Sequence, residues 1–276
     1  NSIRGVAMTG AWMLGPLIGG FTVAEFGIEA CLFIDALTFI FSGAILWTIS
    51  EVPVEREEEG DLREEISEAW AFVKTQPWLF AGIVMFMIWH IGDSAIEIGI
   101  PFIVEDKGLG AKEFGIFGAV GAGGAMIGAA IGGFFPVSRE RRGLVFYIFI
   151  GGIGWCMLMW AMPIPFWIIL FFVLLEGILG GQLRVIWMTT MSDSVDQYLR
   201  GRVNSLDAIG SLIFIPLSPL IGGWMIEETN VLTTYAVAVS LMVVTTMAGL
   251  VVPSFRRFER VDSQKFPLRD FQMKPD

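Results

Sequence analysis

Pro16-Leu17-Ile18-Gly19-Gly20 occurs a second time in the chain, as Pro219-Leu220-Ile221-Gly222-Gly223. A second pair, Asn1-Ser2-Ile3 and Asn204-Ser205-Leu206, is separated by the same 203 positions, so the copies align without a gap. Similarity at a fixed separation is the mark of a duplicated structural unit. We therefore expect an internal repeat.

The composition around these copies predicts a membrane protein. Of 276 residues, 54% are hydrophobic and only 17% are charged, whereas a soluble domain carries about 25% charge. The mean hydropathy is +0.67. The same composition excludes a disordered chain, and the two cysteines, Cys31 and Cys156, lie inside apolar runs and imply no disulfide framework. A net charge of −10 argues against a nucleic-acid partner.

Apolar segments long enough to cross a bilayer recur along the chain, since a spanning helix needs about 20 residues. Strict alternation, which a membrane β-barrel requires, is missing, so we expect an all-α transmembrane protein. Eight segments are predicted: Val6–Phe26, Glu29–Ser50, Trp78–Val104, Glu113–Phe135, Leu144–Met162, Phe166–Met191, Ser205–Ile226 and Val231–Val252. Six spans between the repeat copies keep both copies in one orientation, which predicts a parallel six-helix repeat.

Lys and Arg predict the orientation, because basic residues gather in cytoplasmic loops. One side of the membrane holds Arg139, Arg141, Arg142, Arg200, Arg202, Arg256, Arg257 and Arg260, and the loops on the other side hold only Lys107 and Lys112. We expect a multi-pass protein with both ends of this chain in the cytoplasm.

The acidic connection 51–76 contains a helical pattern. Leu62, Ile66, Trp70 and Val73 recur at helical spacing, with glutamates on other faces. An amphipathic helix on the inner membrane surface and a solvated linker helix both fit this pattern.

Several motifs resemble those of the major facilitator superfamily. Gly15-Pro16-Leu17-Ile18-Gly19-Gly20 resembles the antiporter motif of its fifth helix, and the stretch around Asp35 resembles the next helix of the branch that exports drugs, macrolides and siderophores. The remaining similar segments are the central connection from Asp61 to Pro77, the loop with Arg139, Arg141 and Arg142, and Arg200-Gly201-Arg202 with the residues around it.

The resemblance implies a division of the chain. Residues 1–50 would be the last two helices of an N-terminal bundle, 51–76 a central loop, 77–252 a six-helix C-terminal bundle, and 253–276 a cytoplasmic tail. The eight helices would correspond to helices five to twelve of the twelve-helix fold. Four upstream helices would then be the missing partner of this fragment, and the membrane would be the plasma membrane.

Ionisable residues at bilayer depth are costly and are functional candidates by default. His90, Asp93 and Glu97 share one helix face, and Glu176 and Arg184 lie on the sixth span. Asp93 and Glu176 are each about 15 Å from the outer membrane boundary, near the midplane. We expect them to couple proton movement to transport, with Glu97 and His90 as further carriers; alternatively, they pin helices together.

The other polar candidates have a structural or gating interpretation. Arg184 snorkels to the headgroups or binds an anionic substrate. Asp35 is expected to make a packing or gating hydrogen bond rather than transfer protons. Asp207 is expected at a helix start, as a cap or as a partner of Arg200 or Arg202.

Small residues recur every fourth position at Gly124, Gly128 and Gly132, a spacing that lets helices approach closely in lipid. His90 is the only histidine, so a histidine-based zinc site cannot form, and we predict no enzyme, no cofactor and no metal.

We expect a proton-coupled exporter of amphipathic or lipophilic small molecules that works by alternating access. Its partners would be the lipid bilayer, the substrate and protons. The apolar residues proposed for the cavity lining are Phe86, Met87, Trp89, Met157, Trp160, Trp187 and Met188. A lysophospholipid flippase and a non-transporting receptor or scaffold remain as alternatives.

Overall fold

The computed structural model describes residues 2–48, 62–251, 253, 256 and 258 of the chain. The described residues form helices and connecting turns, and they contain no strand. Six segments are long and apolar enough to cross a membrane: Leu17–Thr48, Pro77–Asp106, Ala111–Phe134, Arg139–Trp160, Phe166–Ser194 and Val231–Val251. The prediction of an all-α, multi-pass membrane protein is confirmed. Residues 49–61 and most of the predicted tail 253–276 lie outside the described residues.

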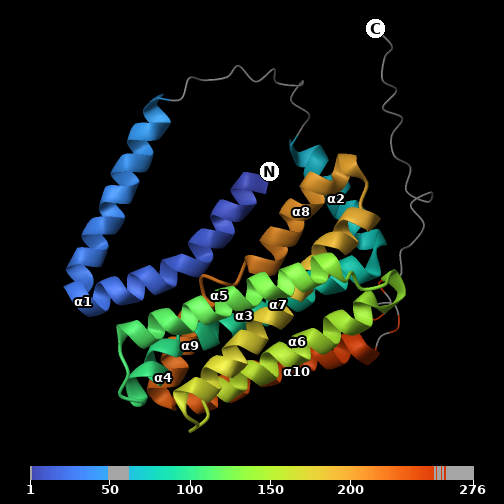
Figure 1. The fold of residues 1–276 in the computed structure, drawn as a ribbon. Coiled ribbons are helices and arrows are strands. Elements are labelled where there is room, and N and C mark those ends of the chain that lie inside the picture. The colour runs from blue at the N-terminus through green and yellow to red at the C-terminus, as the bar shows by residue number, and fades with distance from the viewer. Residues whose placement is uncertain (1, 49–61, 252, 254–255, 257, 259–276) are drawn as a thin grey trace.

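The first two predicted spans form a single element, α1 (Ser2–Thr48), with a sharp bend at Gly27. Gly27 has φ of 83° and ψ of 167°, a conformation that side chains with a Cβ strongly disfavour. The bend divides α1 into two arms that diverge in Figure 1. The first arm packs on α5 (Ala111–Phe134), while the hydrophobic side chains of the second arm are exposed.

Two of the later predicted spans each consist of two helices instead of one. The third consists of α3 (Pro77–Glu97) and the short α4 (Ile100–Asp106). The seventh consists of α8 (Gln197–Leu212) and α9 (Ser218–Glu228). Proline removes a backbone donor from a helix, and Pro101 and Pro216 lie at these two breaks. A count of eight continuous helices is therefore not confirmed.

The remaining long helices form a bundle around one apolar core. These helices are α6 (Arg142–Trp160), α7 (Phe166–Ser194) and α10 (Val231–Val251). In the bundle α5 packs on α7, α7 on α6, α6 on α10, α10 on α3, and α3 on both α8 and α9. Large side chains that are essentially inaccessible fill its centre, among them Trp78, Leu79, Phe146, Tyr147, Ile150 and Tyr235.

The glycine ridge of α5 makes a close helix contact in this bundle. Gly124 and Gly128 are buried against the backbone of α7, where Gly177 lies against Gly124 and Gly181 lies against Ala125. A Cβ built on Gly128 would collide with the backbone carbonyl of Ile178. The predicted close approach along this ridge is confirmed, and the glycines of α7 supply the second half of the interface.

The helix predicted in the central connection is α2 (Leu62–Thr75). It packs on the bundle through Ala69, Phe72 and Val73, which are buried where α2 lies against α8 and α3. Ile66 and Trp70, which belong to the predicted apolar stripe, are 49% and 40% exposed.

Candidate functional site

Asp93 and Glu97 on α3 and Glu176 on α7 form one group of carboxylates. The charge of Asp93 interacts with those of Glu97 and Glu176, and Glu176 also interacts with Glu97. Asp93 and Glu176 are partly buried, and Glu97 is exposed. The three carboxylates that the sequence selected therefore lie within electrostatic range of one another, on two helices that are far apart in the chain.

Helix α3 and helix α7 face each other through aromatic side chains. The ring of Trp187 on α7 lies 5.0 Å from the ring of Phe86 and 5.8 Å from the ring of Trp78, both on α3. Gly82 gives Trp187 the room to lie against the α3 backbone, because a Cβ at this position would collide with the indole ring. Trp187 thus sets the spacing of the two helices that carry the carboxylates.

His90 lies one turn from Asp93 on the same helix face. Its Nδ1 is 2.7 Å from the carbonyl oxygen of Phe86. Since a carbonyl can only accept, Nδ1 is the donor in this hydrogen bond, and in the neutral ring Nε2 is then the acceptor. The ring lies 5.0 Å from the ring of Trp89, which together with Phe86 forms its aromatic surroundings.

Tyr235 on α10 is a polar residue of this region that the sequence analysis missed. Its buried hydroxyl donates a 2.6 Å hydrogen bond to the backbone carbonyl of Ile96, just before the break between α3 and α4. The side chain of Tyr235 also interacts electrostatically with that of Glu97. An isolated tyrosine in an apolar helix gives no sequence signal for such a contact.

Several residues proposed for the cavity lining are instead part of the core. Met157, Trp160 and Trp187 are at most 4% exposed. Met188 is 49% exposed. Near the carboxylates, the partly accessible apolar side chains are those of Phe86, Met87 and Trp89. Arg184, two turns of α7 from Glu176, has an exposed side chain.

Asp207 does not occupy the expected position at a helix start. Helix α8 begins at Gln197, and Asp196 is its N-cap, with its side chain accepting a hydrogen bond from the Tyr198 amide. Asp207 lies within the helix and is partly buried. The prediction of a cap was wrong because the helix extends further toward the N-terminus than the apolar pattern does.

Asp207 instead joins α8 to α7. One carboxylate oxygen accepts a 2.9 Å hydrogen bond from Trp187 Nε1, and the other accepts a 3.3 Å bond from the hydroxyl of Ser211. Both partners are hydrogen-bond donors, so each carboxylate oxygen of Asp207 accepts one hydrogen bond. Asp207 thereby fixes the orientation of the indole that separates α3 from α7.

This hydrogen bond gives a testable stability difference. Trp187→Phe keeps a buried ring but leaves Asp207 without one donor, and we expect a cost of about 1–2 kcal/mol beyond the loss of packing. Trp78→Phe is the matched control, because Trp78 is also buried and its Nε1 has no hydrogen-bond partner within the described part of the chain. Thermal unfolding in detergent would compare the two variants; equal melting temperatures would show that the bond contributes nothing.

The residues with a predicted gating or structural role are spread over the molecule. Gly20 packs on α5, where a Cβ would lie 2.6 Å from the carbonyl oxygen of Ala111, whereas Gly15 and Gly19 have no such neighbour. Asp35 is exposed on the second arm of α1. Pro16 lies within the first arm of α1, and Gly201 is exposed near the start of α8.

The predicted basic residues form contacts at one end of the bundle. Arg142 pairs with Asp193 at 2.6 Å and joins α6 to α7. Arg202 pairs with Glu68 at 3.2 Å and joins α8 to α2. Arg200 donates a 2.9 Å hydrogen bond to the carbonyl of Ser192. Arg139 and Arg141 are exposed in the short 3-10 helix η1 (Arg139–Arg141).

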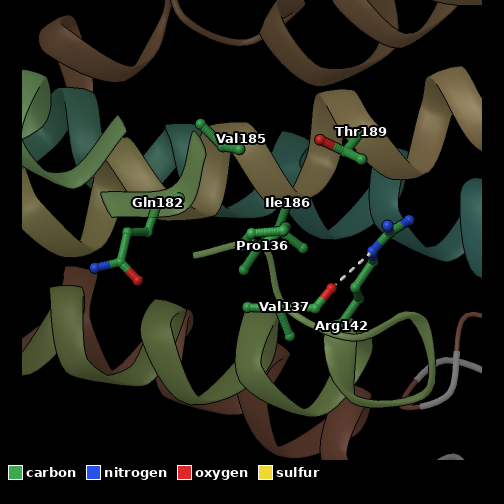
Figure 2. Close-up of a pocket in the computed structure, with 8 residues that line it drawn as sticks. Pro136, Val137, Arg142, Gln182, Val185, Ile186 and Thr189 are labelled. Carbon is green, nitrogen blue, oxygen red and sulfur yellow. Dashed lines mark hydrogen bonds between the residues drawn. The ribbon is translucent and has the colours of Figure 1, made fainter. Parts of the chain in front are cut away.

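A small cavity lies next to Arg142, as Figure 2 shows. Its walls include Pro136, Val137, Gln182 and Ile186, and Arg142 Nε donates a 3.3 Å hydrogen bond to the Val137 carbonyl. The volume of about 20 Å³ leaves room for about one water molecule. This cavity is too small for a substrate, and none of the three grouped carboxylates lines it. Within the described residues, no three His, Cys, Asp or Glu side chains are placed to hold a metal ion.

Comparison with protein families gives a match over residues 1–213, to the model of the Major Facilitator Superfamily. The chain belongs to the Major Facilitator Superfamily. Membership makes it a multi-pass membrane protein of a transporter family. Comparisons with curated proteins and with solved structures gave no match. For this superfamily member, the substrate therefore has to be inferred from its own residues.

Proposed function

We propose that this superfamily member exports amphipathic or lipophilic small molecules across the plasma membrane in exchange for protons. It would do so by alternating access, as a relative of the branch that exports drugs, macrolides and siderophores. The observation that carries the proposal is the group formed by Asp93, Glu97 and Glu176 on two facing helices. The family match supports a transporter but leaves the substrate class, the direction and the coupling ion to this proposal.

The placement of acidic side chains within membrane spans supports proton exchange. Asp93 and Glu176 are partly buried within spans, where an ionised carboxylate without a cationic partner is costly. Binding a proton removes that cost and also the repulsion between neighbouring carboxylates. The group therefore gains and loses protons as its access to water changes, and this is the requirement for a coupling site.

The surroundings support an apolar substrate. Phe86, Met87 and Trp89 are partly accessible on the helix that carries Asp93. Aromatic rings and the flexible methionine adapt to ligands of different shapes. We propose that these three side chains contact the substrate, and that Arg184, on the exposed surface of α7, remains outside this contact.

The proposed orientation places both ends of the chain in the cytoplasm. It rests on the basic residues of the loops, among them Arg139, Arg141 and Arg142 at one end of the bundle and Lys107 at the other. Lys107 donates a 2.9 Å hydrogen bond to the carbonyl of Ile164, and so ties together two loops on the side proposed to be outside.

The test is a proton-flux assay with the full-length gene product in vesicles that enclose a pH-sensitive dye. Lipophilic and amphipathic drugs would be added in turn, and protons should move only when a transported compound is present. Proton movement without a compound, or transport that continues after the pH gradient is removed, would contradict antiport. If well-folded protein moves no proton with any compound, a fluorescent lysophospholipid assay would then distinguish a lipid flippase from a non-transporting protein.

A further inference from the structure

Helix α2 has a second face that no described part of the chain covers. Arg63, Ile66, Trp70 and Lys74 are spaced three or four residues apart, so they form one stripe along the helix. All four side chains are exposed. The helix itself is held by another face, through Ala69, Phe72 and Val73, so the exposed stripe is not a sign of a loosely attached segment.

The stripe lies level with the point where α3 enters the membrane. Only Gln76 separates α2 from α3, which begins at Pro77 and is part of a membrane-spanning segment. The ring of Trp70 lies 6.2 Å from that of Phe80, in an edge-to-face arrangement, and Phe80 is 42% exposed. Because Phe80 is in the first turn of a span, its neighbour Trp70 must lie at the same depth. Tryptophan is enriched at this boundary in membrane proteins.

The charges of the stripe favour an anionic surface. Lys74 places its ammonium group 5.4 Å from the centre of the Trp70 ring, and Arg63 is near the other end of the stripe. The stripe contains two cations and no carboxylate. Glu68 belongs to a different face, where it pairs with Arg202. A cationic stripe that also carries apolar side chains fits the headgroup region of an anionic leaflet.

We propose that α2 rests on the membrane surface through this stripe and binds anionic phospholipids. Ile66 and Trp70 enter the boundary between headgroups and acyl chains, while Arg63 and Lys74 contact the phosphate-bearing headgroups. Glu68 and Arg202 also pair α2 with α8, so the helix proposed to rest on the membrane surface is tied to the bundle on its other side.

The experiment places a nitroxide label on the full-length protein in vesicles, after Cys31 and Cys156 are replaced by alanine. Ile66→Cys reports on the stripe, and Ala71→Cys is the matched control on an exposed position about 100° around the helix from Trp70. Collisions of the label with oxygen, which partitions into lipid, are compared with collisions with a water-soluble nickel complex. The vesicles contain phosphatidylcholine alone or phosphatidylcholine with about one third phosphatidylglycerol.

We expect the oxygen-to-nickel collision ratio at residue 66 to exceed that at residue 71 severalfold, and to rise further with phosphatidylglycerol. Arg63→Gln combined with Lys74→Gln should remove that rise, while the label at residue 71 stays unchanged. Equal exposure of both positions to nickel would overturn the proposal in favour of a solvated helix. A label at residue 66 that neither reagent reaches would mean a protein partner covers the stripe, and would also overturn it. If the oxygen-to-nickel collision ratio at residue 66 is the same with and without phosphatidylglycerol, anionic headgroups are excluded as the ligand.

Discussion

Vesicles that hold Asp93→Asn should show substrate-driven proton movement no greater than that of protein-free vesicles. Asparagine keeps the shape of the side chain but cannot release a proton, so the proposed carrier is lost while its packing is preserved. Asp93 and Glu176 are partly buried, whereas Glu97, the third carboxylate of the group, is exposed. We therefore expect the neutralisation of Asp93 and the change Glu176→Gln to have similarly large effects, and Glu97→Gln to have a smaller one.

Two measurements separate lost coupling from lost folding. Glu105→Gln is the matched control, because Glu105 is exposed at the end of the same span and lies outside the group. It should leave proton movement unchanged. Exchange of labelled for unlabelled substrate requires no net proton movement, so Asp93→Asn should retain it. Undiminished proton movement in Asp93→Asn would remove this residue from the mechanism.

The second large effect is expected at the contact between α5 and α7. Gly128→Val should prevent recovery of monodisperse protein, or lower its melting temperature by many degrees. The added Cβ would collide with the carbonyl of Ile178, and a backbone atom cannot move aside unless the whole of α7 moves. Overpacking of this kind costs about 3 kcal/mol or more when the neighbour cannot relax.

Gly123→Val provides the comparison on the same helix. A Cβ at Gly123 would have no atom within 4 Å, so the added side chain meets open space. Its melting temperature should stay near that of the unaltered protein, since valine is not a worse helix former than glycine. If both variants lose the same stability, the effect would come from the helix itself and not from its contact with α7.

The sequence predicted those features that depend on one helix at a time. The spacing of Gly124 and Gly128 was sufficient to predict a close helix contact, and the cost of charge in lipid was sufficient to select Asp93 and Glu176. The partners across each interface were not predictable in this way. Gly177 and Tyr235 become important only when another helix is placed beside them.

The error at Asp207 has a physical origin. Its position at a helix start was inferred from the apolar pattern of a single segment. In the structure, α8 begins at Gln197, and the indole of Trp187 donates a hydrogen bond to Asp207 within that helix. A hydropathy pattern indicates whether a segment forms a helix, but it contains no information about which other helix will pack against it.

The break between α8 and α9 separates two sets of neighbours. Between Leu212 and Ser218 the backbone is joined by shorter turns, such as the 3.0 Å hydrogen bond from the Ile215 amide to the Leu212 carbonyl. Helix α8 packs on α2 and α3, whereas α9 packs on α3 and α10. The continuous hydrogen bonding of a helix therefore ends between these two sets of contacts, and α3 is the neighbour that α8 and α9 share.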